Sequence, residues 1–491
     1  MSAPPVAEPP LDHKRQLARG MFWMGSATLV AKLVDTVAIV VVLGFLSREQ
    51  LGVATLATSV IAFLESLNGL GIGVALIQRR GLSPAETASA HWYAILVGLA
   101  LTALAALAAP LFAKLYSSPE LTLMTQVGAI KLLFVSMATV PIALLSRDLR
   151  FRDVGLISTI ATVLASAVTI VLAAAGAGAW APVLANTAHG LFQLLGACVL
   201  IPFFPRPRLS FALLRPLIRA GAHLAGGSLL SQVTRNLDYF IVGRFGGVGT
   251  LGTYRIAFDL AMAPMQVVLN VIGRSALPVY SRLATQLPEL LLAFGWTVRS
   301  LWMLGLAPIL IVFLEGERLF DLLAKTPEPH TLTVLRCLCV AALLRAASYP
   351  FPQVLTAIGH TRRSLLEALS STLLITLSMT AFMAFGTGPV AMRVAVAWLV
   401  AYVAQLGVDL LLTRNLLPGI TGALLRALPV PLGIALLVGA VALLVAPLLP
   451  FDATPWPALA HGVFVVALYL LGLRLLAGVR LRALLRAGSS K

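Results

Sequence analysis

Charged residues are scarce in this sequence. Asp, Glu, Lys and Arg make up 11% of its 491 residues, and 59% are hydrophobic, whereas roughly a quarter of a soluble domain is charged. So little polar surface cannot cover a water-facing protein of this length. The alternative solvent is lipid, where a spanning helix needs about 20 apolar residues. Apolar runs of that length recur from Met21 to Ala477, so the sequence predicts a multi-span transporter, channel or membrane enzyme.

Cysteine and catalytic motifs are also lacking. The three cysteines, Cys198, Cys337 and Cys339, have the spacing of neither a zinc site nor a CxxC redox pair, and we interpret them as packing residues. The sequence contains no Walker A motif, no HExxH and no GxSxG in a hydrolase setting. The longest expected outside loop, residues 315–331, is too short for a catalytic domain. We therefore expect no metal, no cofactor and no enzymatic activity.

Positive charge is in excess, with a formal net charge of +17. In a soluble protein this would suggest nucleic-acid binding. Here Lys and Arg gather in short loops between apolar runs, so we expect no nucleic-acid partner. The apolar runs predict an all-α protein of about fourteen transmembrane helices. They cover residues 20–46, 51–77, 88–113, 121–145, 154–175, 179–203, 217–245, 251–274, 292–314, 331–357, 364–385, 389–413, 427–449 and 457–477.

Loop charge tests this helix order independently, because cytoplasmic loops are enriched in Lys and Arg. With the N-terminus placed inside, the inside segments hold most of the basic residues. The outside loops hold only Arg48, Lys114, Arg244, Arg318 and Lys325. The first apolar run extends past Leu46, too long for a signal-peptide core, and is predicted to stay as an anchor. The bias predicts that both termini are cytoplasmic.

An internal repeat divides the chain. The Leu-Gly at 51–52 has a counterpart at 251–252, and each follows a long helix that carries a basic residue three positions before an aspartate. The two dyads are Lys32/Asp35 and Arg235/Asp238. This pattern predicts parallel repeats, namely a six-helix bundle in 1–205 and another in 206–415. Residues 416–491 would then add two helices and a basic cytoplasmic tail.

Several charges fall within the predicted helices. A charge near mid-bilayer costs at least ~2.5–3.5 kcal/mol, so such residues usually face a cavity or a partner. The deep charges are Lys32, Asp35, Glu65, Lys131, Arg235, Asp238, Arg255, Asp259 and Arg345. A second group lies nearer helix ends, where snorkelling is cheap, and is discounted: Arg299, Arg336, Glu367, Arg393 and Asp409.

Six of the deep charges form three pairs at the spacing of helix-face neighbours: the two dyads and Arg255/Asp259. One interpretation is that each pair only neutralises itself for insertion; the other is that the two dyads point at a shared interface. Lys131 and Arg345 have no acidic residue within a helical turn. We predict that these two are unpaired and available to an anion. Further candidates for a polar lining, more often structural when alone, are His91, Asn186, His189 and Gln193.

Longer stretches of sequence carry a family resemblance. The first half contains Gly-Ile-Gly-Val-Ala-Leu-Ile-Gln at 71–78 and Arg-Asp-Leu-Arg-Phe at 147–151. The second contains Asn-Leu-Asp-Tyr-Phe-Ile-Val-Gly-Arg-Phe at 236–245 and Leu-Gly-Thr-Tyr at 251–254. With these pieces the chain resembles Wzx-type polysaccharide and O-antigen flippases, the colanic-acid-exporter-like branch of the multidrug/oligosaccharidyl-lipid/polysaccharide flippase superfamily. Leu277, where an aromatic residue is usual, is a small departure.

The resemblance implies a V-shaped pair of bundles around a central cavity that opens alternately to each side. It also implies a bacterial inner-membrane protein that moves undecaprenyl diphosphate carrying a sugar repeat, for extracellular polysaccharide biosynthesis. Membrane lipids, and a polysaccharide polymerase or export machinery, are the partners that follow from it. The functional unit is expected to be a monomer, since two halves of one chain complete the cavity.

Three functions are weighed, and the leading one follows from the resemblance. The first is the flippase. The second is a cation-coupled exporter of small amphiphiles, for which carboxylates such as Asp35, Glu65 and Asp238 would serve. The third, a membrane glycan polymerase or ligase, needs a large outer loop that the sequence lacks. For the flippase we predict that the diphosphate meets Lys32, Lys131, Arg235 and Arg345. Supporting ion pairs would come from Asp35, Asp238, Arg255 and Asp259.

Overall fold

The computed structural model describes residues 41–322 and 330–445 except 80, 149, 202, 204 and 208, together with 31, 34, 35, 37, 38, 464, 465, 467–472 and 474. The predicted helices at 20–46 and 457–477 lie largely outside the described residues, and so does Lys32. The chain divides into two compact units, Met1–Arg244 (unit 1) and Phe245–Lys491 (unit 2).

Every regular element within the described ranges is a helix, and nine of these helices are long and apolar enough to cross a membrane. Their outer faces are apolar: on α4 (Pro84–Leu115), Leu104, Leu107 and Leu111 are 53%, 81% and 69% exposed. Leucines at this spacing form one stripe on a helix, and a soluble protein rarely exposes such a surface. The all-α membrane class is confirmed, while the total of about fourteen helices stays a prediction.

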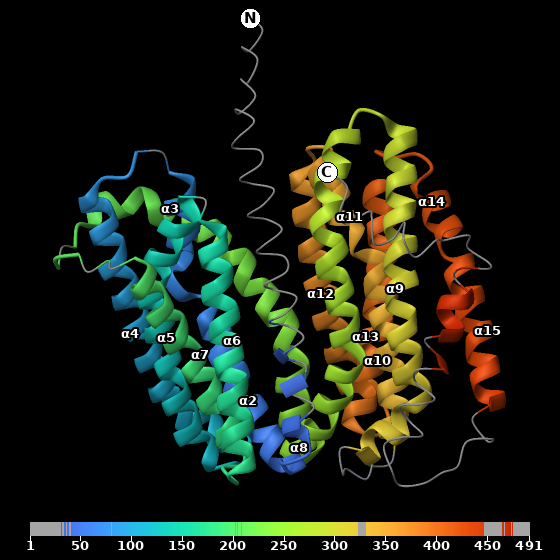
Figure 1. Cartoon of the computed structure of the whole chain (residues 1–491), viewed down its shortest axis with the longest axis horizontal. Coiled ribbons are helices and arrows are strands. Elements are labelled where there is room, and N and C mark those ends of the chain that lie inside the picture. Colours follow the sequence, from blue (N-terminus) through green and yellow to red (C-terminus); the bar gives the residue numbers. More distant parts are fainter. Residues whose placement is uncertain are drawn as a thin grey trace, which may run out of the picture. The chain divides into compact units, whose positions relative to one another are not determined.

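Unit 1 is organised around one central helix, α5, which packs against α2, α3, α4, α6 and α7. Figure 1 shows α4, α5, α6 and α7 running alongside one another. Buried Ile61, Ala105, Ala129 and Leu132, from three of these helices, form part of its core. The elements are α2 (Arg48–Glu65), η1 (Asn68–Gly71), α3 (Ile72–Gln78), α4, α5 (Glu120–Arg147), α6 (Phe151–Ala174), α7 (Trp180–Leu200) and the first part of α8 (Phe211–Leu283).

The helix predicted at 51–77 is interrupted in the structure. α2 ends at Glu65, a short 3₁₀ turn follows, and α3 begins after Gly71, whose φ is 75°. This left-handed conformation is open to glycine at little steric cost. The break places Glu65 at the end of a helix rather than in its middle.

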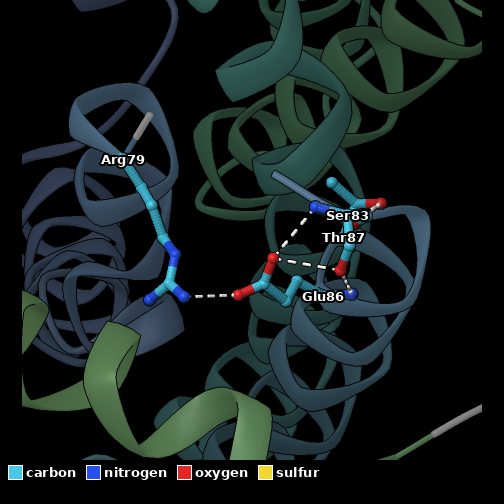
Figure 2. Close-up of polar contacts among 4 residues, drawn as sticks. All are labelled: Arg79, Ser83, Glu86 and Thr87. Carbon is cyan, nitrogen blue, oxygen red and sulfur yellow. Dashed lines mark hydrogen bonds and ion pairs between the residues drawn. The ribbon is translucent and has the colours of Figure 1, made fainter. Parts of the chain in front are cut away.

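A capping box fixes the start of α4 (Figure 2). The Ser83 hydroxyl oxygen accepts a hydrogen bond from the Glu86 N–H at 3.2 Å, and Glu86 Oε2 accepts one from the Ser83 N–H at 2.9 Å. The other oxygen, Oε1, pairs with Arg79 Nη2 at 2.6 Å. The carboxylate therefore caps the positive end of the helix dipole and ties the loop after α3 to α4.

α8 joins the two units and contains both helices predicted at 217–245 and 251–274. Its helical backbone is interrupted at Gly247, with φ 81° and ψ 168°. The first part packs into unit 1, where Leu214 and Leu217 join the core cluster around Ile72. The boundary by packing thus falls after Arg244, later than the repeat boundary near 205. The division into 1–205, 206–415 and 416–491 concerns the repeat and stays a prediction.

In unit 2, α10 packs against α9 and α13, and α12 packs along α13. Pro350 begins α11 and Pro429 begins α15, and each lacks the N–H that a continuous helix would use. An aromatic group joins α8 to α13, since the Trp398 indole N–H donates to the Tyr254 hydroxyl at 3.1 Å. The elements are α9 (Leu287–Leu322), α10 (Thr331–Ser348), α11 (Pro350–Ala357), α12 (Thr361–Phe385), α13 (Val390–Thr413), α14 (Ile420–Ala427) and α15 (Pro429–Val445).

Candidate functional site

The main polar site of unit 1 is centred on Lys131, which is 8% exposed in the middle of α5. Its Nζ lies 2.8 Å from Glu65 Oε2 at the end of α2 and donates to Asn186 Oδ1 of α7 at 2.9 Å. We call Glu65, Lys131 and Asn186 the Lys131 cluster. Three helices thus contribute one group each, and the ammonium has two oxygen partners.

Neighbouring residues of α7 shape this cluster. Gly190 lets the lysine stem pass, because a Cβ added there would lie 2.9 Å from Lys131 Cγ. The His189 imidazole interacts electrostatically with Lys131 and Glu65, and its Nε2 lies 3.5 Å from the Thr162 hydroxyl of α6. The small residue at 190 and the polar residue at 189 therefore both serve the buried cation.

The prediction that Lys131 is unpaired is wrong. Its acidic partner, Glu65, lies far away in sequence on another helix, which spacing along a single helix cannot reveal. The Glu65 side chain is 30% exposed and that of Lys131 only 9%. The carboxylate is therefore the more accessible member of the pair, and an incoming anion would have to replace it.

Arg345 of α10 is the corresponding cation of unit 2, and its partners are neutral. Its Nη2 donates to Gln266 Oε1 of α8 at 2.9 Å, and the Gln266 amide N–H donates in turn to Asn270 Oδ1 at 3.0 Å. Among the described residues no carboxylate lies within ion-pair distance of this guanidinium. The amide chain holds the arginine in place without cancelling its charge.

The predicted dyads have different outcomes. Arg255 Nε lies 2.6 Å from Asp259 Oδ2, so this ion pair is confirmed. In the dyad of α8, Asp238 is fully buried and Arg235 exposed, and the orienting role of Asp238 stays a prediction. In the other dyad, Asp35 is half-buried and Lys32 lies outside the described residues.

Two carboxylates that sequence reasoning discounted are buried. Glu367 of α12 and Asp409 of α13 are 9% and 0% exposed, so their assignment as snorkelling charges is wrong. Snorkelling needs the long stem of Lys or Arg, and an aspartate has none. Glu367 has Arg363 one turn before it on α12, but that guanidinium donates to the Leu412 carbonyl oxygen instead. For Asp409, the sequence signal is the polar residue one turn away on α13, Gln405.

His91 takes the structural role. It is 7% exposed, and its ring packs edge-on against Phe203 with centroids 5.4 Å apart. The three cysteines are free thiols, half-buried or buried. Unit 2 also has a pocket beside the Gly247 interruption, lined among others by Thr250, Tyr254 and His330 and without Lys or Arg in its lining.

Comparison with known proteins shows which family this chain belongs to. A family model described as "Polysaccharide biosynthesis protein" matches residues 41–318, more than half of the sequence. The chain belongs to this family. The lipopolysaccharide biosynthesis protein WzxC of Escherichia coli K12 is 24% identical to it over 358 residues, which is 71% of each chain. ExoT of Rhizobium meliloti, a succinoglycan biosynthesis transport protein, is 25% identical over 321 residues, 62% of this chain and 64% of its own.

Solved structures show which fold the family member has. The lipid II flippase MurJ, in an inward closed conformation, matches with a TM-score of 0.70 at 12% identity, over 94% of this chain and 99% of its own. An inward-facing multidrug transporter of the MATE family and the MOP superfamily matches with a TM-score of 0.62 at 17% identity, over 80% and 96%. The predicted superfamily fold is confirmed, and the chain is a multi-pass membrane protein of the polysaccharide biosynthesis family.

Lys131, which is buried, and Arg345, which is half-buried, therefore lie within membrane-spanning helices of a member of this family. Lys131 is neutralised in its resting arrangement and needs an exchange of partners to bind an anion. Arg345 keeps its full charge beside an amide and offers a planar fork of N–H donors, which suits phosphate. Both provide charge-assisted hydrogen bonds where the surroundings are apolar.

Proposed function

We propose that this protein is a flippase for a lipid-linked oligosaccharide. It carries a sugar repeat unit on undecaprenyl diphosphate from the cytoplasmic to the outer leaflet of the bacterial inner membrane, by alternating access, for extracellular polysaccharide biosynthesis. The observation that carries the proposal is Arg345, a cation within a spanning helix whose partner is the neutral Gln266. Membership of the polysaccharide biosynthesis family supports the glycan, and the naming of WzxC and ExoT after glycan pathways supports it further.

The chemical reason to expect a diphosphate at Arg345 is the free-energy cost of keeping a cation within the membrane. An arginine kept within a membrane span costs free energy, and a diphosphate oxygen bound there recovers part of it. In unit 1, we expect a phosphate oxygen to take the place of Glu65 on Lys131, because that carboxylate is partly exposed. Lys32 and Arg235 are proposed as further ligands, steadied by Asp35 and Asp238. The sugars need no charged contact under this proposal.

The same proposal includes the topology, oligomeric state and partners of the protein. Both termini lie in the cytoplasm, as the loop charges predict, and the functional unit is a monomer surrounded by membrane lipids. A polysaccharide polymerase or export machinery receives the translocated unit.

Complementation of a flippase-null strain tests the role of the two cations. Arg345→Gln should reduce polymer output roughly 10- to 100-fold, since a charge-assisted hydrogen bond is worth ~1.5–3 kcal/mol. Arg345→Lys should retain part of the output because it keeps the charge. The matched control is Arg336→Gln on the same helix, whose guanidinium lies over Phe313 at 5.6 Å and has no assigned role.

Expression of each variant is checked first by membrane immunoblot. Lys131→Ala should also lose output, with Glu65 left behind as an uncompensated acid. Full polymer output from Arg345→Ala and Lys131→Ala, singly and combined, at normal expression would show that neither cation binds the diphosphate.

A further inference from the structure

A buried carboxylate pair lies between α12 and α13 in unit 2. The Gln405 amide nitrogen donates to Glu367 Oε1 at 3.3 Å and to Asp409 Oδ1 at 2.8 Å. One NH₂ group thus bridges two acids, and all three side chains are at least nine-tenths buried. We call Glu367, Gln405 and Asp409 the carboxylate pair site.

One buried carboxylate oxygen of the carboxylate pair site has no hydrogen-bond partner among the described residues. The Ser370 hydroxyl lies 2.8 Å from the Glu367 backbone carbonyl oxygen, its nearer acceptor, and 3.3 Å from Gln405 Oε1. The second oxygen of Asp409, Oδ2, is buried and has no hydrogen-bond partner among the described residues. Ser348, at the end of α10, is 7% exposed and faces Asp409, yet its hydroxyl is also without a hydrogen bond in the described structure.

The cations on the surrounding helices are engaged elsewhere. Arg363 of α12 donates to the Leu412 carbonyl oxygen at 2.7 Å, and Arg345 of α10 donates to Gln266. Arg393 of α13 donates to backbone carbonyls at the opposite end of the helix pair. In the described part of unit 2, no cation lies within ion-pair distance of Glu367 or Asp409. The remaining charged residues of the packed elements are Arg336, Arg362 and Arg426.

Two carboxylates in this setting do not both ionise. They share one donor, they have no counter-ion, and burial penalises each negative charge. Coupled acids of this kind bind protons as a pair. A metal cation fits poorly, because the N–H donors of Gln405 already point at both acids. Within the described residues, no group of three or more His, Cys, Asp or Glu side chains could hold a metal.

We propose that Glu367 and Asp409 form a proton-binding site in unit 2, which takes up and releases one proton in the transport cycle. The proposal rests on the proposed function for the meaning of that cycle. Glu367 lies near the start of α12 and Asp409 near the end of α13, so both are at the same end of this antiparallel pair. In the expected topology this end faces the cytoplasm. Loss of the proton would place two negative charges between α12 and α13, which favours their separation.

Difference infrared spectroscopy of the purified full-length protein tests the proton directly, without a substrate. Wild-type protein should show a carboxylic acid C=O band that disappears as pH rises, and Glu367→Gln or Asp409→Asn should lose it. The control is Glu315→Gln, because Glu315 is similarly buried but has a cationic partner, Arg318, at 2.7 Å. A band that persists unchanged in both variants overturns the proposal. Should a single variant misfold by circular dichroism, the doubly neutral Glu367→Gln/Asp409→Asn variant provides the comparison.

Proteoliposomes with an imposed pH gradient test its use. Wild-type translocation of a lipid-linked sugar should respond to the gradient, and the doubly neutral variant should run at one rate with or without it. Translocation by wild-type protein that ignores the pH gradient, or that follows a sodium gradient instead, contradicts the proton site and leaves the flippase intact. A titrating band in a protein that moves no lipid-linked sugar supports the site and removes the proposed function.

Discussion

The Lys131 cluster gives the most quantitative prediction, because its two charges depend on each other. Glu65→Gln leaves Lys131 as a buried cation with only Asn186 as a partner. Removing one member of a fully buried pair costs ~3–5 kcal/mol, and the partial exposure of Glu65 lowers this to an expected ~2 kcal/mol. Lys131→Met keeps the length of the stem and removes the charge. We expect the double variant to be more stable than the sum of the single losses predicts, by ~1 kcal/mol or more.

The assay is reversible unfolding in mixed micelles, followed by circular dichroism, with the four proteins of the cycle measured side by side. Glu120→Gln is the matched control, since Glu120 is an exposed acid at the start of the same helix and should change stability by less than ~0.5 kcal/mol. Additive effects of Glu65→Gln and Lys131→Met on the free energy of unfolding would refute the reasoning. Additivity is the result expected for two groups that do not interact.

Three further predictions concern packing and topology. Gly190→Ala should destabilise unit 1 by ~1–3 kcal/mol in the same unfolding assay, because the added Cβ meets Lys131 Cγ at 2.9 Å. Its control is Gly422→Ala, which has open space around the added Cβ and should be neutral or stabilising. Equal losses of stability in the two variants would count against this account. Trp398→Phe should cost ~1 kcal/mol by removing the indole donor to Tyr254, and an unchanged midpoint would show that this hydrogen bond adds nothing. Reporter fusions at Asp12 and Gly488 should both score cytoplasmic, and one external result would break the predicted helix order.

The fold was largely predictable from sequence, because lipid imposes simple rules. Apolar length and loop charge located most of the helices that the structure describes. The misplaced boundaries have local causes, namely Gly71 in a left-handed conformation and Pro350 and Pro429 at new helix starts. The break in α8 between unit 1 and unit 2 was less visible, since the non-helical conformation of Gly247 cannot be predicted from composition.

The site was predictable only in part. A buried lysine in an apolar run signals a polar cluster, but its partner Glu65 comes from another helix and depends on tertiary packing. Glu367 and Asp409 do lie near helix ends, but their interpretation as snorkelling charges failed because nearness to a helix end was taken for access to water. Their burial results from the close packing of α12 against α13, which one helix at a time does not show.

Translocation of a lipid-linked sugar by the purified protein tests the central claim most directly. Proteoliposomes are loaded on one leaflet with a fluorescent sugar on a polyprenyl diphosphate, and a membrane-impermeant quencher reports its arrival on the other. The account predicts that wild-type vesicles lose the protected fluorescence faster than empty vesicles, and that vesicles with Arg345→Gln resemble the empty ones while Arg336→Gln matches wild type. Wild-type vesicles that behave like empty vesicles, with folded protein inserted in them, would contradict the account.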